Sequence, residues 1–334
     1  MAIYGFHASH EQVHPRRLLD AVKHAEQAGF EAAMCSDHFA PWSERQGQSG
    51  FAWSWLGAAL EATNLKLCVV NAPGQRYHPA IIAQAAATLS AMYPGRFWAA
   101  LGSGENANEH ITGDAWPRKD VRNARLREAV DVMRDLFAGE EVSRDGLVTV
   151  DRARLWTRPE TPPPLIGAAV SVETAAWVAD WADGLATIAQ PREKLQEMIA
   201  AYRGAGGRGP LVLQVHVSYA RTDAEALAIA HDQWRTNVFS PPLCWDIDTP
   251  EGFDEAAKHV RPEHMRESVL VSSDPAFFVD RLGELQSLGF DEVYLHHVGV
   301  EQTDFIDTFG GHVLPQLRTS RAATASVPTL TEAS

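Results

Sequence analysis

The residue types best suited to chemistry stand together in the segment Cys35-Ser-Asp-His-Phe-Ala-Pro-Trp42. It offers a carboxylate, an imidazole and an indole directly after an apolar stretch that ends at Met34. Parallel α/β proteins place ligands and catalytic groups where such strands end. Histidine exchanges protons near neutral pH, so Asp37 and His38 are candidates for acid–base chemistry, and a purely structural loop is the alternative.

Polar side chains also follow or end the other apolar stretches of the chain. They are His7, Ser9, His10, Glu11, Asn71, Ser103, Glu105, Asn106, Asn108, His216, His296 and His297. So many polar and titratable groups in one plane favour an active site. A metal-dependent hydrolase is a weaker hypothesis, because no His-x-His closes the first strand and the adjacent His296 and His297 would point to opposite faces. We therefore expect no metal.

Eight short apolar stretches, each followed by a helical pattern, must position these groups. We expect strands at Ile3–His7, Phe30–Ser36, Leu65–Val70, Arg96–Leu101, Pro164–Ala168, Gly184–Ala189, Leu211–Ser218 and Glu292–His297. Apolar spacing predicts helices at Pro15–Ala28, His78–Met92, Val121–Phe137, Val172–Trp181, Arg192–Tyr202, Asp223–Arg235 and Phe277–Leu288. This count favours a closed (β/α)8 TIM barrel over a doubly wound sheet, which usually has a Gly-x-Gly-x-x-Gly loop after its first strand.

The chain is expected to form one barrel domain over residues 1–318. Two segments interrupt the alternation: residues 139–163 look like a hairpin insertion, and residues 236–262 look like a lid or substrate loop. Residues 319–334 are rich in small polar types, and we expect a flexible C-terminal tail.

The overall composition indicates a small-molecule enzyme. With 29 basic and 43 acidic residues the formal net charge is −14, which disfavours binding to nucleic acid or to anionic membranes. No stretch approaches the roughly 20 apolar residues that span a bilayer. Three scattered cysteines fit a reducing compartment. We therefore expect a cytoplasmic protein with a small-molecule substrate.

Three longer motifs carry a family resemblance. They are Ser36-Asp-His-Phe-x-Pro-Trp42, Arg76-Tyr-His-Pro79 with Ile82-Ala-Gln84, and Gly102-Ser-Gly-Glu-Asn-x-Asn-Glu109 with Thr112-Gly-x-x-Trp-Pro117. From about Tyr4 to Leu317 the chain resembles the luciferase-like family of flavin and deazaflavin oxidoreductases, nearest to the subgroup of F420-dependent glucose-6-phosphate dehydrogenases. The resemblance implies an interrupted (β/α)8 barrel that holds an isoalloxazine-type ring at its C-terminal mouth. It also implies hydride transfer and, by analogy, a homodimer.

The resemblance implies roles for five side chains. His38 would be the base that takes a hydroxyl proton, and Glu105 would act as an acid near the ring. Trp42 would border the ring, and Glu11 would orient the substrate or His38. Asp37 would contact the ring or hold His38. The oxidation of an alcohol needs a base, and a hydride acceptor benefits from a nearby proton donor.

The same resemblance implies which residues bind the cofactor. They are Asp37, Val69, Val70, Asn71, Ala72, Ser103, Gly104, Glu105, Asn108, Gly167, Ala168 and Ala169. In the family, a non-proline cis peptide bond supports the ring, and here it would fall near Val69-Val70. The cofactor is expected to be F420, with FMN as the alternative. An FMN-dependent luciferase-like monooxygenase or reductase is accordingly the alternative function.

The chain departs from the subgroup at its phosphate contacts. Ile166-Gly-Ala-Ala-Val170 replaces a glycine pair, and Thr187-Ile-Ala-Gln-Pro191 lacks the lysine expected for a substrate phosphate. Gly252-Phe-Asp-Glu-Ala-Ala257 offers acids where the subgroup offers lysine. We therefore expect no useful activity on glucose 6-phosphate. Trp53, Trp55, Trp116 and Trp245 are candidates for an apolar substrate site, with core packing expected for at least two of them.

Overall fold

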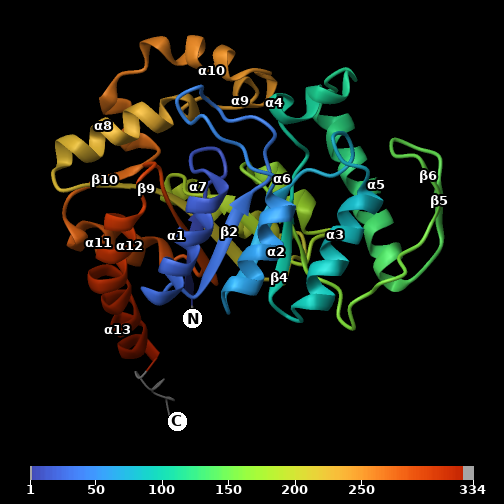
Figure 1. The fold of residues 1–334 in the computed structure, drawn as a ribbon, viewed down its shortest axis with the longest axis horizontal. Coiled ribbons are helices and arrows are strands. Elements are labelled where there is room, and N and C mark those ends of the chain that lie inside the picture. The colour runs from blue at the N-terminus through green and yellow to red at the C-terminus, as the bar shows by residue number, and fades with distance from the viewer. Residues whose placement is uncertain (1, 326–334) are drawn as a thin grey trace, which may run out of the picture.

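A computed structural model describes residues 2–325 and shows eight parallel strands that close into a barrel (Figure 1). These strands are β1 (Ile3–Ala8), β2 (Ala32–Ser36), β3 (Lys66–Asn71), β4 (Phe97–Leu101), β7 (Leu165–Ala168), β8 (Leu185–Ile188), β9 (Leu211–Tyr219) and β11 (Glu292–His297). The ring closes because β11 pairs with both β1 and β9, while β8 also pairs with β9. The predicted (β/α)8 barrel and all eight of its strands are confirmed.

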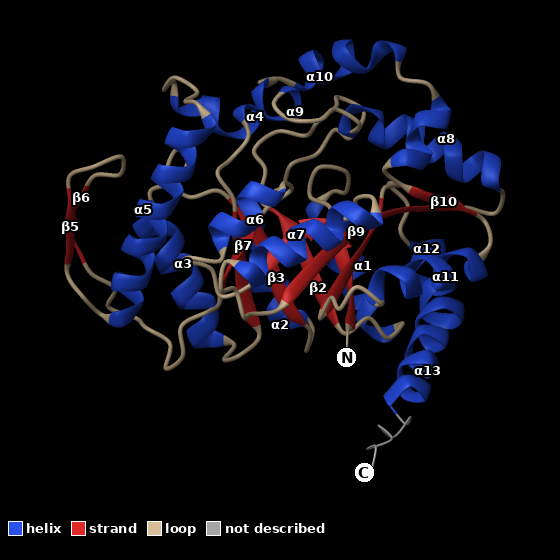
Figure 2. Ribbon diagram, turned by 180° about the vertical axis from the view of Figure 1, so that it is seen from behind, coloured by secondary structure: helices blue, strands red, loops and turns tan. Residues whose placement is uncertain are grey.

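Helices surround the barrel, as Figure 2 shows with the strands in red at the centre. They are α1 (Pro15–Gln27), α2 (Ala52–Ala62), α3 (Pro79–Met92), α5 (Lys119–Ala138), α6 (Val172–Val178), α7 (Arg192–Gly204), α8 (Asp223–Trp234), α11 (Pro275–Gln286) and α12 (Thr303–Thr308). Sequence analysis missed α2, because this helix is apolar on most sides and buries both Trp53 and Trp55. A helix without a polar face gives no clear 3.6-residue pattern.

The two insertions lie outside the barrel wall. The first contains the antiparallel hairpin of β5 (Val142–Arg144) and β6 (Val150–Ala153), which confirms the predicted hairpin. The second contains α9 (Leu243–Asp246), α10 (Pro250–Ala256) and the 3-10 turns Arg235–Asn237, Ala257–His259 and Pro262–Glu267. Both ribbon views place α9 and α10 with α4 (Asn106–Glu109) at the end opposite the N-terminus, which is the mouth of the barrel.

Helix α12 and two further features were not predicted. A short strand, β10 (Leu270–Ser272), pairs with β9 at the edge of the sheet. A π-helical turn at Phe309–Val313 leads into α13 (Leu314–Ala325), so helix continues through residues 319–325 of the predicted tail. That stretch is rich in alanine and contains no glycine or proline, which favours helix. Residues 326–334 lie outside the described residues.

The inside of the barrel is filled at its base and hollow at its mouth. Bulky side chains at the base include Trp98, Ile166 and Tyr294. Gly5 makes room for the last of these, since a Cβ atom there would lie 2.3 Å from the Tyr294 ring. Closer to the mouth, Ala100 and Ala186 are too small to fill the centre. The strands therefore end around a cavity.

Candidate active site

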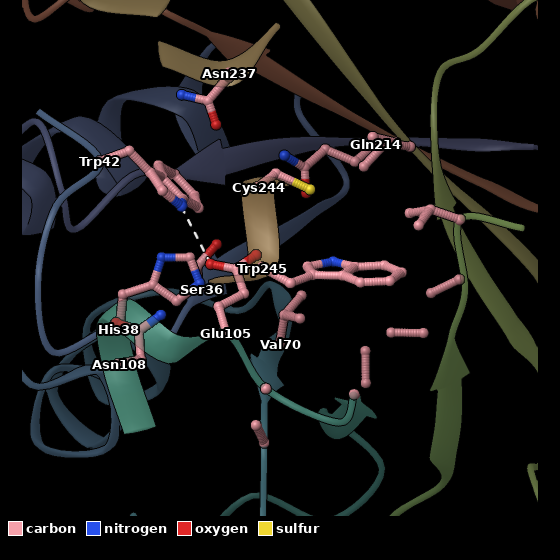
Figure 3. Close-up of a pocket in the computed structure, with 18 of the residues that line it drawn as sticks. Ser36, His38, Trp42, Val70, Glu105, Asn108, Gln214, Asn237, Cys244 and Trp245 are labelled. Atoms are coloured by element: carbon pink, nitrogen blue, oxygen red, sulfur yellow. Dashed lines mark hydrogen bonds between the residues drawn. The ribbon is translucent and has the colours of Figure 1, made fainter. Parts of the chain in front are cut away.

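The mouth of the barrel holds a cavity of about 480 Å³, shown in Figure 3. Most of the predicted site residues lie on its wall: His38, Trp42, Asp37, Val70, Asn71, Ala72, Ser103, Gly104, Glu105, Asn108, Ala168 and Ala169. Glu11, Val69 and Gly167 do not. The closed sheet thus brings together residues that are far apart in sequence.

His38 and Glu11 form a buried pair beside the cavity. Nδ1 of His38 lies 2.9 Å from Oε1 of Glu11, in an ion-pair contact whose angles fall short of an aligned hydrogen bond. Burial favours the uncharged forms of both groups, but their mutual attraction and the other nearby charges and hydrogen bonds together outweigh it. The pKa of Glu11 is lowered to about 2, and the pKa of His38 is raised above its ordinary value. Of the two roles foreseen for Glu11, this contact supports the orientation of His38.

Trp42 and Glu105 make a second polar contact on the cavity wall. The indole Nε1 of Trp42 donates a hydrogen bond to Oε2 of Glu105 at 3.1 Å. The His38 ring meets the Trp42 ring edge-on, with centroids 4.5 Å apart. Figure 3 shows the three side chains grouped on one side of the cavity, near Trp245. A base, an indole and a carboxylate therefore face the same space.

Asp37 has both carboxylate oxygens occupied by neighbouring side chains. Oδ2 accepts hydrogen bonds from Trp53 Nε1 at 3.0 Å and from Asn71 Nδ2 at 2.8 Å, while Oδ1 accepts one from Tyr77 at 3.3 Å. The side chain has no exposed surface, and Arg76 lies 3.7 Å away. Asp37 thus fixes the loop that carries His38, whereas the contact with the imidazole itself belongs to Glu11.

The profile of the luciferase-like monooxygenase family matches residues 3–292. The chain belongs to this family. An F420-dependent glucose-6-phosphate dehydrogenase from Kribbella flavida is 36% identical over 328 residues, which cover 94% of this chain and 98% of the relative. One from Mycobacterium tuberculosis is 33% identical over 329 residues, which cover 94% and 97%.

Solved structures of luciferase-like enzymes share this fold. An F420-dependent secondary alcohol dehydrogenase in complex with an F420-acetone adduct superimposes with a TM-score of 0.88 at 29% identity, covering 95% of this chain and 99% of that one. The F420-dependent tetrahydromethanopterin reductase from Methanopyrus kandleri has a TM-score of 0.75 at 22% identity, which supports the fold. The predicted family and the assignment as an oxidoreductase are confirmed.

One feature expected of a luciferase-like enzyme is absent. The peptide bonds from Cys68 to Pro73 are trans, and the cis bond within the described residues is Pro241-Pro242. The prediction of a cis bond near Val69-Val70 is therefore wrong. Here β3 keeps its regular parallel pairing with β4 as far as Asn71, whose carbonyl accepts the Gly102 N–H at 2.9 Å. A trans backbone makes these contacts without the roughly 3 kcal/mol that a non-proline cis bond costs.

Val69 and Gly167 point away from the cavity for reasons of strand geometry. Successive side chains of a strand alternate between its two faces. Val70 therefore faces the cavity, while Val69 packs in the core between the barrel and its helices. Gly167 lies against α6, where an added Cβ atom would be 2.5 Å from Val178.

The buried histidines on β1, β9 and β11, next to the His38 loop, are uncharged. His7 and His296 stack with ring centroids 4.3 Å apart, and the Gln214 amide lies 3.1 Å from His216 and 3.4 Å from His296. Burial lowers the pKa of His7 to about 3 and that of His216 to about 4. This histidine-lined part of the wall is polar but carries no charge at neutral pH.

No group of three or more His, Cys, Asp or Glu side chains in residues 2–325 could hold a metal ion.

Several wall residues escaped sequence analysis. Lys119 begins α5, Trp234 ends α8, and Gln214 lies within β9. Of the four candidate tryptophans, Trp245 reaches the cavity, while Trp53 and Trp55 are buried in the core. A lysine in a helical, mostly charged stretch gives no sequence signal of its own. The nearest sequence signal to Lys119 is the family motif that ends at Pro117, two residues earlier.

Arg76 and Glu109 form a buried ion pair at the cavity wall, which Glu109 helps to line. Arg76 donates its backbone N–H to Oε2 of Glu109 at 2.7 Å, and its guanidinium lies 3.8 Å from the other carboxylate oxygen. Burial raises the pKa of Glu109, although Arg76 opposes the shift. Both residues lie in the motifs that carried the family resemblance.

No helix within residues 2–325 is both long and apolar enough to span a membrane.

Proposed function

We propose that this protein transfers a hydride between F420 and a small organic substrate that carries a hydroxyl or carbonyl group. The observation that carries the proposal is the buried Glu11–His38 pair, which presents a polarised imidazole to the cavity beside Trp42 and Glu105. The relatives named above are F420-dependent dehydrogenases, and the structure with an F420-acetone adduct has the same fold.

The cavity suits a planar tricyclic ring. Ala100, Ala168 and Ala186 leave a slot at its base, where larger side chains would close it. Asn71, which also lines the cavity, donates its amide N–H to Asp37, and its Oδ1 finds no hydrogen-bond partner among residues 2–325. An N–H group on a bound ring would satisfy this oxygen. When bound, F420 supplies a carbon centre that accepts or donates a hydride.

His38 handles the proton that accompanies hydride transfer. With Nδ1 turned to Glu11, its Nε2 is the nitrogen left to take the proton of a substrate hydroxyl. Glu11 stabilises the imidazolium that results, in the way a buried carboxylate assists the histidine of other acid–base sites. In the reverse direction the imidazolium returns the proton to a carbonyl oxygen. Glu105, which accepts a hydrogen bond from Trp42, would supply a second carboxyl group beside the ring.

Glucose 6-phosphate is a poor match for this cavity. Gln190 lines the wall in the loop where the subgroup offers a lysine. On α10, Asp254 is an acid whose oxygens accept hydrogen bonds from Ser43 Oγ and Glu44 N. Phe239 and Phe253 add apolar surface. We therefore propose a substrate less anionic than a sugar phosphate. Turnover of glucose 6-phosphate at low KM would refute this part of the proposal.

The direct test is to titrate the apoprotein with F420 and with FMN while following tryptophan fluorescence. Trp42 and Trp245 on the cavity wall should be quenched when a ring binds. Tighter binding of F420, followed by reduction of F420 by secondary alcohols, supports the proposal. Preferential binding of FMN with oxygen-dependent turnover would favour the alternative, an FMN-dependent monooxygenase. The homodimer and the cytoplasmic location stay predictions.

A further inference from the structure

Lys119 is a positive charge without a counter-ion on the cavity wall. Its Nζ donates a hydrogen bond to Ser103 Oγ at 2.7 Å and lies over the Trp245 ring, 4.5 Å from its centroid. Within residues 2–325, no carboxylate forms an ion pair with it, and no other lysine or arginine lines the cavity. In a chain with a net charge of −14, an unpaired lysine at this position is unexpected.

The surroundings of Lys119 disfavour its charge. Arg122, one helical turn away on α5, adds a second positive charge, although Asp246 lies 3.9 Å from that guanidinium. Burial, with a smaller effect from Arg122, lowers the pKa of Lys119 to about 8. Cys244 of α9 is the other titratable neighbour, and burial raises its pKa to about 12, so it is uncharged at neutral pH. An anion beside Lys119 would remove the imbalance.

We propose that Lys119, with the Ser103 hydroxyl beside it, binds an anionic phosphate or carboxylate group on the side chain of the bound cofactor. The inference rests on the proposed function, in which the substrate itself carries no phosphate. The segment Gly167-Ala-Ala169, where the related dehydrogenases present a glycine pair, leaves less bare backbone for a phosphate. Lys119 of α5 compensates by supplying a positive charge next to Ser103.

The test compares cofactors with and without their anionic groups. Apoprotein is titrated with F420 and with its ribityl core, which lacks the phosphate and carboxylates, and likewise with FMN and with riboflavin. The variants are Lys119→Met, Lys119→Arg and, as a matched control, Arg118→Met, which removes the same charge from an exposed neighbour. Binding is followed by fluorescence, so no turnover is needed.

Lys119→Met should weaken binding of F420, or of FMN if the protein prefers flavin, by roughly tenfold or more, because a charge-assisted hydrogen bond to the phosphate is lost. The affinity of Lys119→Met for the phosphate-free compound, the ribityl core of F420 or riboflavin, should stay within about twofold of the wild-type affinity. Lys119→Arg should retain most of the affinity, and Arg118→Met should match wild type. Wild-type affinity for the phosphate-bearing member should also fall as the pH rises through about 8, where Lys119 loses its charge.

Equal weakening of both members by Lys119→Met would overturn the inference, since the lysine would then only pack against the ring site. Unchanged binding of both would overturn it as well. If Lys119→Met instead raises KM for an anionic substrate alone, the anion belongs to the substrate and the assignment to the cofactor is wrong. Failure of wild type to bind F420 would count against the proposed function, while the FMN and riboflavin pair would still decide the role of Lys119.

Discussion

Replacing Glu11 by glutamine removes the negative charge beside His38 and changes the size of the side chain very little. Glu11 has no exposed side-chain surface and His38 has 14%, so water screens the pair poorly. The pKa of Glu11 falls from its ordinary value of 4.5 to about 2, because burial, which raises it, is outweighed by His38 together with a backbone hydrogen bond and His7. At 1.36 kcal/mol per pH unit, this corresponds to about 3 kcal/mol of stability at neutral pH.

The sign of this effect sets the pH window in which it can be measured. A carboxyl group with a lower pKa in the folded state stabilises the fold above its unfolded pKa and loses that effect as the pH falls. Glu11→Gln should therefore be less stable than wild type by about 3 kcal/mol at pH 7. The difference should shrink as the pH falls from 4.5 towards about 2. Urea unfolding at several pH values measures it, with exposed Glu141→Gln as the control.

The same substitution changes the proton affinity of His38. Glu11 is the main group that raises the pKa of His38 against the effect of burial, with a smaller contribution from Glu105, so Glu11→Gln should move the midpoint of the His38 NMR titration to lower pH. The acidic limb of the pH–rate profile for alcohol oxidation should move to lower pH as well, because the neutral imidazole is the base. A midpoint that stays in place or rises would refute the coupling between the two residues.

Three further substitutions test the rest of the site. His38→Ala should lower turnover by roughly two to four decades and leave F420 affinity unchanged; unaltered turnover would remove His38 from the mechanism. Trp42→Phe breaks the 3.1 Å bond to Glu105, and should lower turnover by roughly tenfold and reduce the quenching caused by cofactor; full retention of both would place the ring elsewhere. Asp37→Asn should destabilise the protein by about 1–3 kcal/mol in urea unfolding, because one of the two oxygens that accept from Trp53, Asn71 and Tyr77 becomes an NH2 donor facing another donor. It should leave the His38 titration unchanged, and a large shift would mean that Asp37 rather than Glu11 governs His38.

The barrel could be predicted from the sequence because its signals are local. Each apolar strand and each amphipathic helix lies within one short segment, and eight repeats of that unit leave few alternative folds. The exceptions follow the same rule. Helix α2 is apolar on most sides and lacks the alternating pattern, while β10 has three residues and owes its place to pairing with β9.

The site could be predicted only in part. Motif resemblance and strand ends indicated His38, Trp42 and Glu105, and the structure brings all three to one cavity. Resemblance alone left open whether Asp37 or Glu11 holds the imidazole. That choice depends on the distance between the neighbouring loops that follow the paired strands β1 and β2, which carry Glu11 and His38.

By itself, then, the sequence determined the eight-stranded architecture, the family and the group of residues at the strand ends, because these depend on local spacing and on motifs. The tertiary structure decided which partners those residues have. It pairs His38 with Glu11, and it surrounds the Asp37 carboxylate with the donors of Trp53, Asn71 and Tyr77. It also buries His7, His216 and His296, which are therefore uncharged. It also brought Lys119 of α5 to the cavity without a counter-ion. Burial and charge pairing arise only when the strands close into a ring, so no single segment of sequence carries them.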